Sequence, residues 1–177
     1  DARVPGQPSA VIVGRPYNGG DLGANLDLPY KLRRMGVVPI PMDFLPLDQA
    51  VLPKLHEDMY WRSGQDILRA ANVIRRDDRL QAIYLTNFNC GPDAFLITFF
   101  HEEMGDKPFL ELEVDEHTAD AGMITRCEAF FDSLNIRQVL VPVAGQSHAK
   151  RDRLRQLRGA EGVTTAIIFC NRKTTVR

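Results

Sequence analysis

The stretch Ala82-Ile-Tyr-Leu-Thr86, continued by Asn87-Phe-Asn-Cys-Gly-Pro-Asp93, is the clearest indicator of the fold class. Its first part is an apolar run typical of a buried strand, and its second part contains the glycine and proline of a loop. Residues 92–104 then follow a helical pattern, which Gly105 is expected to end. A buried strand, a short loop and a helix form the repeating unit of parallel α/β sheets.

The same unit recurs on both sides of this stretch. We expect strands at 10–14, 37–42, 82–86 and 108–114, and helices at 22–35, 59–74, 92–104 and 119–134. Two prolines in the second run indicate an edge or distorted strand, because proline cannot donate to a central ladder. Strands that alternate with helices pair in parallel through right-handed crossovers. The sequence therefore predicts an α/β protein with a Rossmann-like three-layer fold and a mainly parallel sheet.

Composition limits the class of protein. The 177 residues suffice for one ordinary domain, or for a domain of about 130 residues with an incomplete appendage. The chain has no apolar run long enough to span a membrane, and its first residues lack a signal-peptide layout. Its three cysteines are an odd number at wide spacings, which argues against a disulfide framework. We expect a soluble cytoplasmic protein that makes no membrane contact.

The net charge of −1 conceals two parts of opposite sign. Residues 1–134 contain 13 Lys and Arg against 21 Asp and Glu, whereas residues 135–177 contain 9 against 2. Such a change of sign indicates either a domain boundary near Leu134 or a solvated helix face rich in arginine. We therefore predict a lobe at 9–134 and a second segment at 135–177.

Three polar loops follow predicted strands, at residues 15–21, 87–93 and 115–120. Ligands of open parallel sheets bind beyond the carboxyl ends of the strands, so these loops are the expected place for a site. Arg15 and the glycines after it suit contact with an anion. The loop is neither a Walker motif nor a dinucleotide fingerprint, so nucleotide binding is not predicted.

Cys90 lies directly between a predicted strand and a predicted helix. A helix amino terminus lowers the pKa of a thiol and favours a thiolate that acts as nucleophile or metal ligand. The alternative is a buried, inert cysteine in a tight turn.

Asp115 and His117 follow the next predicted strand. They would orient a ligand or move a proton there. The alternative is that they belong to a capping turn in which Thr118 or Asp120 closes the next helix.

Four longer stretches of residues 9–134 resemble one known family. They are Gly14-Arg-Pro-Tyr-Asn18 with Leu22-Gly-Ala-Asn-Leu26, Ile40-Pro-Met-Asp-Phe-Leu-Pro46, Asn87-Phe-Asn-Cys-Gly-Pro-Asp93, and Lys107-Pro-Phe-Leu-Glu-Leu-Glu-Val-Asp-Glu-His-Thr-Ala-Asp-Ala-Gly122. They are similar to the carboxy-terminal region of large CoA-substrate-specific activases. That region is related to 2-hydroxyglutaryl-CoA dehydratase subunits and to double-cubane iron–sulfur proteins.

The resemblance implies ATP-coupled, low-potential electron transfer through a [4Fe–4S] type of cluster. Cys90 matches the cysteine of the family's motif and would be a metal ligand, with Asn87, Asp115 and His117 around the cofactor. The other ligands and the activator's ATPase domain would lie upstream of this chain. The chain alone would then lack lyase or reductase activity, and a homodimer around the cluster is compatible with it. Cys127, in the middle of a predicted helix, is expected to pack in the core.

The basic segment resembles a different family. Gln138-Val-Leu-Val-Pro-Val143, residues 150–157 and Gly162-Val-Thr-Thr-Ala-Ile-Ile-Phe-Cys-Asn-Arg-Lys173 are similar to the start of the second RecA-like domain of DEAD-box RNA helicases. This implies an incomplete β-α-β unit with RNA as a partner of the basic tail, but without the motifs of a working helicase. The alternatives to the iron–sulfur interpretation are therefore an RNA-binding helicase fragment, or an inactive hybrid of two truncated coding segments.

Overall fold

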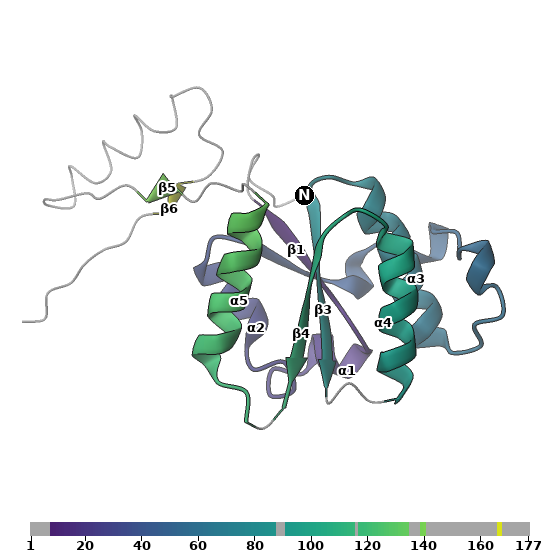
Figure 1. Ribbon diagram of the computed structural model, residues 1–177, viewed down its shortest axis with the longest axis horizontal. Coiled ribbons are helices and arrows are strands. Elements are labelled where there is room, and N and C mark those ends of the chain that lie inside the picture. The colour runs from purple at the N-terminus through teal and green to yellow at the C-terminus, as the bar shows by residue number, and fades with distance from the viewer. Residues whose placement is uncertain (1–7, 88–90, 116, 135–138, 141–165, 168–177) are drawn as a thin grey trace, which may run out of the picture.

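The computed structural model describes residues 8–87, 91–115 and 117–134, and the backbone of two short strands further along the chain (Figure 1). The main sheet contains β1 (Ser9–Val13), β2 (Val38–Pro41), β3 (Leu80–Asn87) and β4 (Phe109–Val114). The strand order is β2-β1-β3-β4, and every neighbouring pair is parallel. All five residues of β1 are buried, as expected for a central strand that is covered on both faces.

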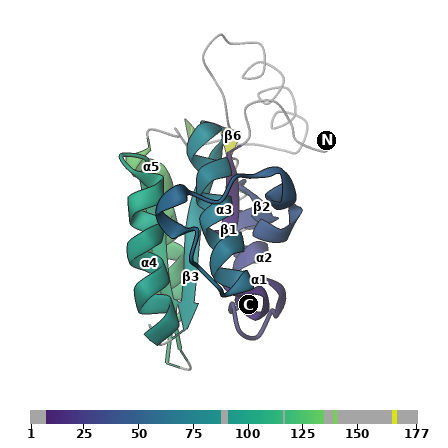
Figure 2. The ribbon, with the colours of Figure 1, turned by 90° about the vertical axis from the view of Figure 1, so that its right-hand side faces the viewer.

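Helices cover both faces of this sheet. On one face, α2 (Leu28–Arg34) and α5 (Asp120–Ser133) pack against alternate strand residues, and Leu32, Phe131 and Ile83 belong to one core cluster there. On the other face, α3 (Arg62–Arg76) and α4 (Gly91–Met104) pack against the intervening residues, such as Tyr84. Figure 2 views the molecule with α3 and α4 in front of the sheet. The predicted three-layer, Rossmann-like fold with a parallel sheet is confirmed.

The position of β2 also agrees with its sequence. It is an edge strand, paired only with β1 in the described part of the sheet, and it contains Pro39 and Pro41. Three short 3-10 turns lead from it to α3: η1 (Met42–Phe44), η2 (Leu47–Gln49) and η3 (Lys54–His56).

The helix predicted at 22–35 is wrong in its first half. The chain forms a short α1 (Pro16–Gly20), then turns, and α2 begins only at Leu28. Leu26 and Asp27 have left-handed backbone angles, with φ of 50° and 54°, which no α-helix contains. Pro29 accounts for the late start, because proline is tolerated in the first turn of a helix but not in its interior.

The segment after Leu134 is described only at β5 (Val139–Leu140) and β6 (Ala166–Ile167). These strands pair in parallel with each other, in a sheet separate from the main one. The helix expected at 150–157 lies outside the described residues, and the division of the chain near Leu134 stays a prediction. In the parts of the chain that are described, no helix has the length and apolar character needed to cross a membrane.

Candidate functional site

The carboxyl ends of β1 and β3 form the switch point of the sheet. From β1 the chain turns to β2 on one side, and from β3 it proceeds to β4 on the other. The two loops that leave a switch point diverge, and ligands of open α/β sheets bind in the crevice between them. The predicted loops 15–21 and 87–93 leave from these two strand ends, and the third loop follows neighbouring β4.

A buried carboxylate connects the first two loops. Asp93, in the first turn of α4, is only 2% exposed. It accepts a hydrogen bond from Arg15 Nη2 at 2.7 Å and another from Thr86 Oγ1 at 2.8 Å. The Arg15 guanidinium also lies over the ring of Tyr17, 5.0 Å from its centre. Charge-assisted bonds of this kind stabilise a buried carboxylate and fix the geometry of the groups that make them.

The loop after β1 packs directly on β3. A Cβ atom at Gly14 would lie 2.6 Å from the Leu85 carbonyl oxygen, so only glycine fits there. Asn18 is fully buried and donates from Nδ2 to the same carbonyl at 3.2 Å. Its Oδ1 atom has no hydrogen-bond partner among the described residues. A buried polar atom of this kind is a place for an ordered water or a ligand group.

Asn87 ends β3 and connects it to β4. It is paired with Val114 in the sheet register, and its Nδ2 donates to the Val114 carbonyl oxygen at 3.3 Å. Within the described structure its Oδ1 atom is buried and has no hydrogen-bond partner. The register thus brings Asn87 and the residues after β4 to the same end of the sheet, as the sequence predicted for Asn87 and Asp115.

Asp115 takes part in a tight turn before α5. Its Oδ1 accepts from Thr118 Oγ1 at 2.8 Å and from the His117 backbone N–H at 2.9 Å. These bonds, the one from Thr118 above all, hold the pKa of Asp115 below its ordinary value. Thr118 therefore belongs to this turn, but the predicted capping role is wrong for both Thr118 and Asp120, because the N-cap residue of α5 is Ala119 and no side chain caps the helix. A carboxylate that stays ionised can accept a hydrogen bond from a ligand, and it is poorly suited to transferring a proton.

His117 contributes its backbone to the same turn, and its side chain is exposed to solvent. A cofactor-binding role for His117, Asp115 and Asn87 stays a prediction.

The cysteines are not equivalent. Cys90 and Cys170 lie outside the described residues. Cys127 lies on the buried face of α5, and burial raises the pKa of its thiol to about 11. Such a thiol stays protonated, so the packing role predicted for Cys127 is confirmed.

The cysteines of this chain would supply one ligand of a four-iron cluster, and not the complete set. A four-iron cluster needs several thiolates, and the chain has three cysteines, one of which belongs to the core. Among the residues whose placement is described, which exclude Cys90, no three His, Cys, Asp or Glu side chains form a group suited to a metal ion.

Two residues of this site were not predicted from the sequence. Asp93 and Thr86 gave no signal of their own, since an aspartate in a helix's first turn and a threonine in a strand are both ordinary. Their importance comes from burial, which depends on how α4 packs on the sheet.

Comparison with known proteins gives no relative: no family model, no curated protein and no solved structure matches this chain. The resemblance to activases and dehydratases therefore depends on the sequence motifs alone.

Proposed function

We propose that residues 9–134 are an incomplete lobe of an iron–sulfur protein of the 2-hydroxyacyl-CoA dehydratase and activase kind, in which Cys90 donates one thiolate to the cluster. One observation carries this proposal. The loop that contains Cys90 joins the carboxyl end of β3 to the start of α4 at the switch point. A buried hydrogen bond between Thr86 and Asp93 connects the two flanks of that loop, and Arg15 donates a part-buried one to Asp93.

The surroundings of the loop suit a thiolate ligand. The amino terminus of a helix of ordinary length, such as α4, favours negative charge on the residues just before it. Polar groups around a cluster tune its potential through hydrogen bonds and charge. Arg15 follows the end of β1, and Asn87 is the last residue of β3. A bound cluster would supply the ability to take up one electron at low potential and pass it on.

The remaining ligands have to come from outside this lobe. Cys127 is committed to the core, so Cys90 is the one cysteine of residues 9–134 that remains for the cluster. A second copy of the chain, or a further segment of a longer protein, would supply the other thiolates. An ATP-dependent activator would supply the electron, and the isolated chain is expected to be inactive.

Iron and acid-labile sulfide per chain, measured after strictly anaerobic reconstitution with an added small thiol, test the proposal. The added thiol replaces the missing ligands. We expect iron and sulfide in the intact chain, loss of most of both in Cys90→Ser, and retention of both in the matched control Cys127→Ala. Equal iron in the intact chain and in Cys90→Ser, or no iron in either, would overturn the proposal.

A further inference from the structure

We propose that His56 is a pH-sensitive anchor, which holds the connection between β2 and α3 against α4 more firmly when its imidazole is protonated. The connection comprises residues 42–61 and lies on the outer side of α3 and α4 (Figure 1). It is a different part of the molecule from the candidate site, so the proposal does not depend on the proposed cluster.

His56 is the only buried residue between Met42 and Gly64. The structure describes every residue between these two, and all the others are exposed or partly buried. Aromatic side chains of the same connection face solvent, and Phe44 and Tyr60 are 81% and 80% exposed. Because the one fully inserted side chain is a histidine, the attachment of the connection depends on a group that can change its charge.

The His56 ring is inserted against α4. It lies beside the ring of Phe99, with centroids 4.6 Å apart. Its Nε2 atom lies 3.7 Å from Oε1 of Glu103 and 3.9 Å from Oε2 of Glu102. Among the described residues this buried nitrogen has no hydrogen-bond partner. The imidazole therefore faces two carboxylates at distances slightly longer than a hydrogen bond.

A positive charge on this ring strengthens the contact. Histidine ordinarily gains its charge as the pH falls from about 8 to about 5, whereas glutamate keeps its own charge over most of that range. The Glu103 side chain is 14% exposed and that of Glu102 is 51% exposed, so solvent screens the attraction of Glu103 less. The two carboxylates thus offset the cost of placing a charged ring in a buried position.

Other charged groups near the ring act more weakly. On its own segment the neighbours Lys54, Glu57 and Asp58 are all exposed to solvent, which screens them. From α3, Arg75 Nη1 donates to the backbone carbonyl oxygen of Glu103 at 3.3 Å. In the described part of the chain, the ion pairs of the imidazole are those with the two glutamates of α4.

A role in packing alone makes a different prediction. If His56 only fills space against Phe99, its protonation leaves the attachment of the connection unchanged or weakens it, because a charged ring is costly to bury. An anchor that uses the carboxylates instead becomes stronger as the pH falls. Removal of one carboxylate charge, without a change of side-chain size, separates the two roles.

Hydrogen exchange of the full-length chain, followed by mass spectrometry, measures the attachment. The protection of peptides from residues 42–61 is compared between the intact chain and Glu103→Gln, from about pH 8 to about pH 5.5. The ratio at each pH cancels the intrinsic pH dependence of exchange. We expect the ratio of intact to variant protection to rise about five-fold over this range, the effect of one ion pair at about 4 Å in a solvent-like medium.

Three further variants sharpen the test. Glu102→Gln is expected to act in the same direction with a smaller effect, and His56→Gln to remove the pH dependence. The matched control is His101→Gln, because this exposed histidine of the same helix lies against Phe109, with ring centroids 4.5 Å apart. It is expected to keep the pH dependence of the intact chain.

Circular dichroism identifies a variant that does not fold. If His56→Gln is unfolded, the two glutamate variants and the His101 control decide the outcome. A protection ratio that stays constant with pH in Glu103→Gln would overturn the inference, and so would loss of the pH dependence in His101→Gln.

Discussion

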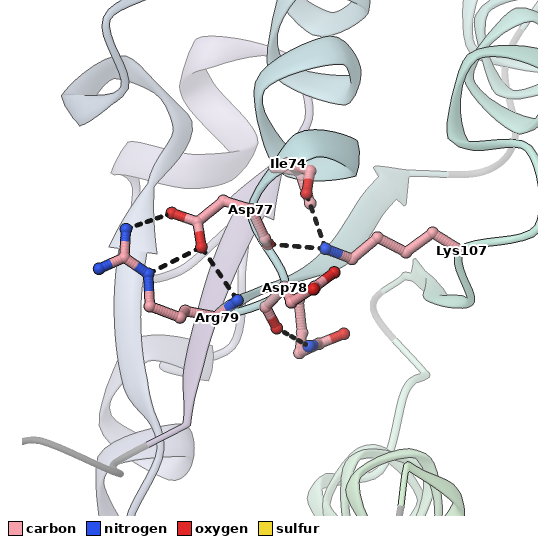
Figure 3. Close-up of polar contacts among 6 residues, drawn as sticks. Ile74, Asp77, Asp78, Arg79 and Lys107 are labelled. Atoms are coloured by element: carbon pink, nitrogen blue, oxygen red, sulfur yellow. Dashed lines mark hydrogen bonds and ion pairs between the residues drawn. The ribbon is translucent and has the colours of Figure 1, made fainter.

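At the scale of single residues, the end of the sheet opposite the candidate site shows how the chain ends α3 and begins β3 (Figure 3). Lys107 Nζ donates to the carbonyl oxygens of Ile74 and Asp77, both at 2.7 Å. These carbonyls belong to the last turn of α3 and its C-cap, where helices leave acceptors unpaired. Asp77 in turn accepts from the Arg79 side chain at 2.8 and 2.6 Å. The contacts fix the three-residue connection between helix and strand.

Asp77 should make stability depend on acid pH. Hydrogen bonds from Arg79 lower the pKa of Asp77 from 3.8 to about 2. A depressed pKa in the folded state means that the contribution is present above about pH 4 and lost as the pH falls towards 2. Because Arg79 is exposed, we expect less than about 1 kcal/mol. Urea unfolding of the intact chain and of Asp77→Asn should give a stability difference that shrinks over this range. A difference that is constant with pH would contradict this account.

The residues of the candidate site were predictable only in part. Asn87 and Asp115 were placed correctly at the ends of neighbouring strands, because the parallel topology and the strand boundaries follow from the apolar pattern. Asp93 and Thr86 were not found, since no local pattern distinguishes a buried, bonded carboxylate from an exposed one in the same helix turn. Burial of a single polar residue is decided by tertiary packing, which the local sequence does not encode.

At the scale of elements, the start of α2 offers a test of backbone strain. Asp27 is exposed and left-handed, with φ of 54°, and its side chain makes no capping hydrogen bond to α2. Glycine adopts this conformation without steric cost, whereas alanine does not. We expect Asp27→Ala to have a free energy of unfolding about 1 kcal/mol lower than that of Asp27→Gly. Equal stabilities in urea unfolding would show that the left-handed turn is not strained.

The same element shows where the sequence pattern was insufficient. Leucines at 22, 26, 28 and 32 follow roughly helical spacing, and this predicted one helix where the chain makes turns and a shorter helix. The pattern of burial was right for Leu28 and Leu32, which are fully buried, but Leu22 is exposed. Periodicity identified the face that packs on the sheet, whereas the proline at position 29 decided where the helix begins.

At the scale of the whole molecule, the positions of the helices determine on which side of the four-stranded sheet a further strand could be added. Crossover connections between parallel strands are all right-handed. A helix on one face therefore takes the chain to a strand on one side, and a helix on the other face takes it to a strand on the opposite side. The first crossover uses the face of α2 and leads from β1 to β2, whereas the α3–α4 face leads towards β4. α5 lies on the α2 face, and it therefore does not lead to a strand beside β4. In agreement, β5 pairs with β6 and not with the main sheet.

This topology predicts that residues 1–134 fold without the basic segment. Both core clusters are built from residues between Ala10 and Phe131, with Leu134 at the margin of the cluster beneath α2 and α5. Each face of the sheet already has two helices. Ending the chain after Leu134 should keep cooperative thermal unfolding with a midpoint within about 4 °C of the full chain, because both described core clusters stay complete. Differential scanning calorimetry of the two chains measures this directly. A truncated chain that unfolds without a cooperative transition would show that the basic segment belongs to the same folding unit, and that the boundary at Leu134 is wrong.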